Sequence, residues 1–137
     1  MGMVANTTKR RFAVGVALLL TVVSACGSDR PAVDDWQSSW VRISAAIPDE
    51  ASLAASDSVQ TVCADTLVFL RSNRSELFPT PDLAIDGVVT AWIEIAEDAF
   101  FECPPSSEQI GDFAEAYAEM SRLGAEIELV LDMDRNE

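Results

Sequence analysis

Three cysteines and 23 carboxylates are the side chains best suited to chemistry in this 137-residue sequence, which contains no histidine. Without histidine, a serine or cysteine nucleophile lacks its usual general base. The cysteines alone fall short of a zinc site, which usually combines four cysteine and histidine ligands. The six glycines are scattered, so the sequence has no glycine-rich phosphate-binding loop. We therefore expect a protein that is not an enzyme and that holds no metal and no cofactor.

The clearest group of carboxylates lies in a predicted helix, where Glu94 and Asp98 are four residues apart and share one face. Helical bundles that hold two metal ions also supply Glu-x-x-His pairs, which this sequence lacks. Trp92, Ile95 and Ala99 define the buried side of the same helix, so we expect the carboxylates to face solvent. A cell-wall hydrolase that works with two facing carboxylates is a remote alternative.

Cys26 follows a pattern that is typical of an export signal. Three basic residues, Lys9-Arg10-Arg11, precede an apolar segment of 14 residues from Phe12 to Ala25, which ends in small residues. A membrane-spanning helix needs about 20 mostly apolar residues, so this segment predicts a cleaved signal peptide. An uncleaved N-terminal anchor is the alternative. In both cases we expect the following domain to lie outside the cytoplasm.

The segment Val23-Ser24-Ala25-Cys26 resembles the lipobox of bacterial lipoproteins, in which the cysteine is acylated and becomes the mature N-terminus. The resemblance implies lipidation of Cys26 with palmitate-type chains, a signal peptide over residues 1–25 and a lipid-anchored tether over residues 26–33. The mature protein would then be extracytoplasmic and held on the cell membrane by its N-terminal lipid. Residues 8–12 also resemble a twin-arginine signal with lysine in place of the first arginine, so the export route stays open.

Lipidation of Cys26 would leave Cys63 and Cys103 as an even pair. Outside the cytoplasm, such a pair is expected to form a disulfide. The bridge would close a long loop and stabilise the fold by about 4 kcal/mol in the chain-entropy model. Two buried free thiols, packed as small apolar groups, are the alternative.

The charge balance restricts the partners of the mature chain. All 23 acidic residues follow Cys26, whereas three of the nine basic residues precede it, which leaves a formal charge of −17 and no lysine. Such a surface repels nucleic acid and anionic lipid, so we expect no nucleic-acid partner and expect the lipid alone to hold the membrane. Solubility is the simplest explanation for the acidity. A cationic partner or weakly bound divalent ions are the alternative.

Apolar residues recur at helical spacing throughout residues 34–137, and no segment alternates like a strand between turn signals. A first helix is expected to end before Pro48, and a second to run from about Ser58 to Asn73. Four amphipathic helices with short connections predict an all-α fold, namely a small antiparallel four-helix bundle with one disulfide, over residues 34–137.

The last two helix starts are predicted from capping signals. Thr80 before Pro81 is a good N-cap and first-turn pair for the third helix. Ser106 and Gln109 form a capping box for the fourth helix. Gly124, inside that fourth helix, costs about 1 kcal/mol against alanine, so it marks a close helix contact or a break.

Trp36 and Trp40 are spaced, together with Ile43 and Ile47, as one stripe of the first helix. This spacing predicts that the two tryptophans are part of the core. Two alternatives stay open from sequence: the rings could lie at the membrane surface, where tryptophan is favoured, or they could line a groove for a ligand.

These features predict a non-catalytic helical module of the cell envelope that contacts another envelope protein or a small ligand. The alternative is a ligand-sequestering lipoprotein with an apolar pocket between helices, although the same aromatic residues also suit a packed core. The pocket would be lined by Trp92, Phe100, Phe113 and Tyr117. The acidic, lysine-poor composition with one cysteine pair resembles small lipoproteins of actinobacteria, and a salt-adapted archaeon would give similar acidity.

Overall fold

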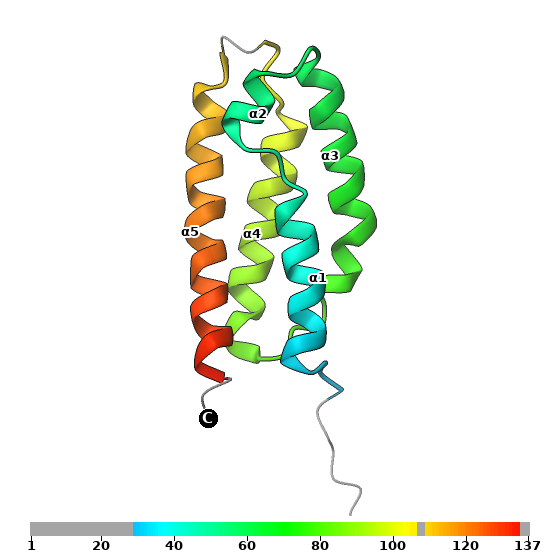
Figure 1. Cartoon of the computed structure of the whole chain (residues 1–137), viewed down its shortest axis with the longest axis vertical. Coiled ribbons are helices and arrows are strands. Elements are labelled where there is room, and N and C mark those ends of the chain that lie inside the picture. Colours follow the sequence, from blue (N-terminus) through cyan, green and yellow to red (C-terminus); the bar gives the residue numbers. More distant parts are fainter. Residues whose placement is uncertain (1–28, 107–108, 135–137) are drawn as a thin grey trace, which may run out of the picture.

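The computed structural model describes residues 29–106 and 109–134, so the predicted signal peptide and residues 26–28 of the predicted tether, including Cys26, lie outside the described residues. The described part is helical and contains no strand. Its elements are α1 (Val33–Ala45), α2 (Glu50–Ala54), α3 (Val59–Asn73), the 3₁₀-helix η1 (Arg74–Leu77), α4 (Leu83–Phe101) and α5 (Gly111–Asp134). The four long helices lie side by side as a bundle, with α2 near one end (Figure 1). None of the described helices is both long and apolar enough to cross a membrane.

Helix α1 carries the predicted apolar stripe into the core. Trp36, Trp40 and Ile43 are buried, with only 2%, 1% and 1% of their surfaces exposed. The two indole rings stack with their centroids 5.9 Å apart. Core packing of the tryptophans is therefore confirmed, and neither ring lies on the surface of the domain.

Helix α3 begins at Val59, next to the predicted start at about Ser58. The Ser58 side chain accepts a hydrogen bond from the Thr61 backbone N–H, which satisfies one of the free donors of the first turn. The helix ends at Asn73, as expected, and the chain continues through η1 to the buried Leu77. The short helix α2 has its own cap, since Asp49 accepts from the Ser52 backbone N–H at 2.6 Å.

The N-cap of α4 is Asp82, and the prediction that Thr80 caps this helix is wrong. The Asp82 carboxylate accepts from the Ala84 backbone N–H at 2.6 Å, and the helix begins at Leu83. The Thr80 side chain is instead fully buried. Aspartate is at least as good an N-cap as threonine, so the stronger of two nearby caps sets the helix start.

Helix α5 also starts later than predicted, since it begins at Gly111 and not at a capping box formed by Ser106 and Gln109. A backbone bond from the Gln109 N–H to the Ser106 carbonyl, 3.1 Å long, belongs to the turn before the helix. Gly124 lies within the continuous helix, and a Cβ built there would lie 3.6 Å from Trp40 Cζ2. Gly124 therefore marks a close helix contact and not a break.

The predicted disulfide is present and joins Cys63 near the start of α3 to Cys103, with the two Cα atoms 5.9 Å apart. Equal helix lengths measured from the connecting turn would have placed Cys63 beside Ala96. The helix η1 reduces this mismatch. Helix α3 beyond Cys63 contributes about 15 Å and η1 about 8 Å, which together approach the length of α4, about 28 Å.

Candidate functional site

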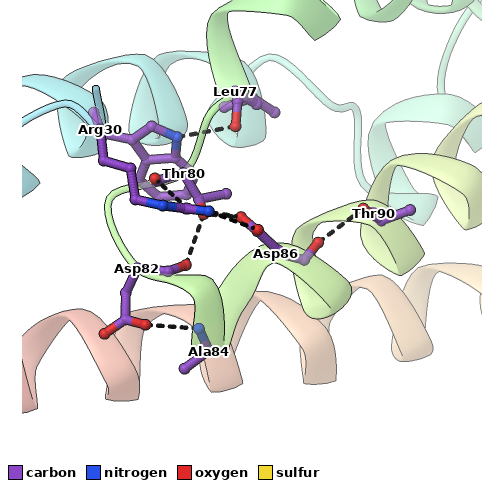
Figure 2. Close-up of polar contacts among 8 residues, drawn as sticks. Arg30, Leu77, Thr80, Asp82, Ala84, Asp86 and Thr90 are labelled. Atoms are coloured by element: carbon purple, nitrogen blue, oxygen red, sulfur yellow. Dashed lines mark hydrogen bonds and ion pairs between the residues drawn. The ribbon is translucent and has the colours of Figure 1, made fainter. Parts of the chain in front are cut away.

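Arg30 lies three residues before α1 and is bound to the start of α4 (Figure 2). Its two terminal nitrogens donate to the two oxygens of Asp86, each at 3.1 Å, which is the paired geometry that suits a guanidinium and a carboxylate. Nη1 also donates to the Thr80 carbonyl oxygen at 2.8 Å and to the Thr80 hydroxyl oxygen at 3.1 Å. The Arg30 side chain is 22% exposed. We call Arg30, Thr80 and Asp86 the Arg30 clasp.

The clasp is arranged by the turn before α4. The Thr80 hydroxyl lies within hydrogen-bond distance of the Asp82 carbonyl oxygen, at 2.7 Å, and of the Asp86 carboxylate. The Arg30 guanidinium and, to a smaller extent, the Thr80 hydroxyl lower the pKa of Asp86, because both stabilise the ionised carboxylate. The same hydrogen bond to Asp86 raises the pKa of Arg30. The pair is therefore charged at neutral pH.

A second bond holds α1 against the same turn. The Trp36 indole N–H donates to the Leu77 carbonyl oxygen at 3.1 Å, and both residues are buried. Leu77 is the last residue of η1, so the start of α1 is held to the segment between α3 and α4 (Figure 2). Together with the Arg30 clasp, this bond holds the chain from Arg30 to Trp36 against the segment that precedes α4.

The four predicted pocket residues divide between two cavities and the core. Phe100 is 2% exposed and makes an edge-to-face contact with Phe113, with ring centroids 5.1 Å apart. Phe113 also stacks on Tyr117 at 6.2 Å. A cavity of about 640 Å³ has Phe113 in its wall, whereas Trp92 and Tyr117 line a separate cavity of about 260 Å³.

The larger cavity lies between the end of α4 and the start of α5. Its walls combine apolar residues, Ile95, Ala99 and Phe113, with the carboxylates of Asp98 and Glu102. The carboxylates give its rim a negative charge. The structure thus brings one predicted pocket residue, Phe113, together with an acidic rim that the apolar pattern alone did not indicate.

The acidic residues singled out in the sequence lie on the surface of α4, since Glu94 and Asp98 are both exposed. Within the described ranges, no three cysteine, aspartate or glutamate side chains come close enough together to hold a metal ion. Glu97 pairs instead with Arg74 at 3.3 Å, which links α4 to η1. Glu94 and Asp98 thus lie on a solvated face, and the neighbouring Glu97 makes an ion pair to η1.

Comparison of the chain with protein-family models, curated proteins and solved structures finds no match. The functional interpretation therefore depends on the geometry of the chain itself. The Arg30 clasp is the site that the sequence did not predict, because Arg30 and Asp86 are 56 positions apart and neither stands in a motif. The available signals are an isolated arginine in an acidic chain and a carboxylate in the first turn of α4.

Proposed function

We propose that this protein is an extracytoplasmic lipoprotein, anchored to the cell membrane through Cys26, whose helical domain serves as a non-catalytic interaction module of the envelope. The observation that carries the proposal is the Cys63–Cys103 disulfide. It pairs two of the three cysteines and leaves Cys26 without a partner in its own chain. Disulfides persist mainly in oxidising compartments, which agrees with the export pattern before Cys26.

The Arg30 clasp supports a close mount on the membrane. Only residues 27–29 separate Cys26 from Arg30, so the lipid would lie within about 14 Å of the clasp at 3.5 Å per residue. The end of the domain that carries the clasp would then lie beside the membrane. The cavity with the acidic rim lies near the other end of α4, where it would be open to a partner.

We further propose that the four long helices form an antiparallel bundle. The disulfide supports this arrangement, since it joins the start of α3 to the end of α4. The clasp supports it too, because it places the residues just before α1 beside the start of α4. In a bundle whose successive long helices alternate in direction, α1 and α4 start at the same end. An antiparallel bundle places the clasp and the disulfide at opposite ends of the domain.

Mass spectrometry of the protein extracted from its own membrane, without reductant, tests the proposal. We expect the mass of the chain from Cys26, plus its acyl groups and minus two hydrogens for the disulfide. A Cys26→Ser variant should lose both the acyl groups and the membrane association. A Cys63→Ser/Cys103→Ser variant, the matched control, should keep them. Acyl groups that persist in Cys26→Ser, or an intact residue 1–25 segment in the wild type, would contradict the proposal.

A further inference from the structure

Trp40 has an unpaired indole N–H in the core. Among the described residues, its Nε1 is the one buried side-chain nitrogen or oxygen without a hydrogen-bond partner. Trp36, one turn earlier on α1, differs in this respect because its Nε1 donates to the Leu77 carbonyl. A buried donor without a partner destabilises a fold, so its retention requires a specific reason.

Trp40, which carries the unpaired donor, lines a cavity of about 260 Å³ between α1, α4 and α5. Trp40, Trp92 and Tyr117 form aromatic walls, and Gly124 lies on the side of α5. The position of a Cβ on Gly124 is 3.6 Å from Trp40 Cζ2. Cζ2 and Nε1 are both bonded to Cε2, so the unpaired nitrogen lies two bonds from the atom of Trp40 that is nearest to Gly124.

The remaining polar groups of the cavity define what could bind there. The Ser44 hydroxyl donates to the Val41 carbonyl and the Ser121 hydroxyl to the Tyr117 carbonyl, so both hydroxyl oxygens keep lone pairs that can accept a hydrogen bond. Glu128 also lines the cavity and is exposed, and its carboxylate disfavours an anion. The cavity therefore offers several acceptors and flat aromatic walls, and one unpaired donor is buried directly behind its wall.

We propose that this cavity binds a small, neutral, planar molecule that carries a carboxamide. The ligand carbonyl accepts from Trp40 Nε1, and the ligand N–H donates to Ser44 or Ser121. The indole nitrogen is shielded from water, so an adjacent side chain must move when the ligand enters. Met120 lines the same cavity, and its unbranched side chain can change rotamer at low cost. This inference goes beyond the proposed anchoring function and does not depend on lipidation of Cys26.

Benzamide, benzamidine and benzoate test the proposal as three probes of nearly equal size. They offer, respectively, a carbonyl with N–H donors, a cation that only donates, and an anion that only accepts. We expect the indole N–H signal of Trp40 in ¹⁵N-labelled, disulfide-bonded protein to shift with benzamide, with a Kd of about 1 mM. Benzoate, which the Glu128 carboxylate repels, should leave this signal unchanged at about 10 mM, and benzamidine, which cannot accept from Trp40 Nε1, should bind no more tightly to the wild type than to Trp40→Phe. An unshifted Trp40 signal with benzamide, or equal binding of the other two probes, overturns the proposal.

Three variants locate the binding. Trp40→Phe keeps an aromatic ring but removes the donor, and it should weaken benzamide binding about tenfold. Gly124→Leu fills the cavity and should abolish binding. Gly87→Leu, the matched control, adds the same side chain to α4 where nothing lies within 4 Å of a Cβ, and it should bind as the wild type does. Unchanged affinity in Trp40→Phe overturns the proposal. If that variant does not fold, retained binding in Gly124→Leu overturns it instead.

Discussion

Removal of the disulfide should weaken the domain by an amount set by the loop that it closes. The bridge spans 40 positions, from Cys63 to Cys103. In the chain-entropy model, opening a loop of this length costs about 4 kcal/mol. A change of 1 kcal/mol shifts the melting temperature of a domain of about 100 residues by about 4–5 °C. We therefore expect the double variant Cys63→Ala/Cys103→Ala to melt about 15–20 °C below the wild type.

Circular dichroism at 222 nm, recorded on heating, measures this difference. Reductant should lower the melting temperature of the wild type toward that of the double variant and should leave the double variant itself unchanged. Cys26→Ala is the matched control, because it removes a cysteine without touching the bridge, and it should melt with the wild type. A loss of less than about 5 °C in the double variant would refute the reasoning, since loop closure would then contribute little to stability.

Three further perturbations have expected outcomes. Gly124→Ala and Gly87→Ala should each raise the free energy of unfolding by about 1 kcal/mol in chemical denaturation, since neither added methyl clashes and alanine is the better helix former; a loss in either variant would contradict the reported spacing. Trp36→Phe should lower it by about 1–3 kcal/mol in the same assay, because the buried Leu77 carbonyl loses its donor; an unchanged value would mean that another donor replaces the indole. Arg30 and Thr80 lower the Asp86 pKa, so the contribution of the carboxylate to stability is complete above the ordinary aspartate pKa of about 3.9 and is lost as the pH falls through the lowered value. Urea midpoints measured from pH 6 down to pH 2 should therefore fall less steeply in Asp86→Asn than in the wild type, and parallel curves would show that the pair is not linked to folding.

Local signals in the sequence predicted those features that are themselves local. Ser58 marks the start of α3 because a cap depends on residues within one turn. The apolar spacing of Trp36, Trp40 and Ile43 indicates a buried stripe for the same reason. The start of α4 was missed where two capping residues, Thr80 and Asp82, stand close together and the Asp82 carboxylate makes the cap.

The sites that depend on distant partners could not be read from the sequence. The Arg30 clasp joins residues 56 positions apart, and no periodicity indicates which carboxylate an isolated arginine will meet. The four residues of the predicted pocket lie in two cavities and the core, and edge-to-face packing of Phe100 on Phe113 takes up the space between those two rings. The Cys63–Cys103 disulfide could be predicted from the sequence only because Cys26 was expected to be lipidated, which leaves two thiols to pair with each other.

The Arg30 clasp has a mechanical consequence for a domain that is mounted by its N-terminus. A pull on an anchor at Cys26 would reach the fold first at Arg30, and the guanidinium would pass it to Asp86 on α4. Helix α4 is the element that the disulfide links to α3, so the load would enter the part of the bundle that is crosslinked. Helix α1 would carry a smaller share of the tension while the clasp held. The Arg30 clasp would thus divert part of a pulling force away from the N-terminal end of α1 and into the two helices that the disulfide joins.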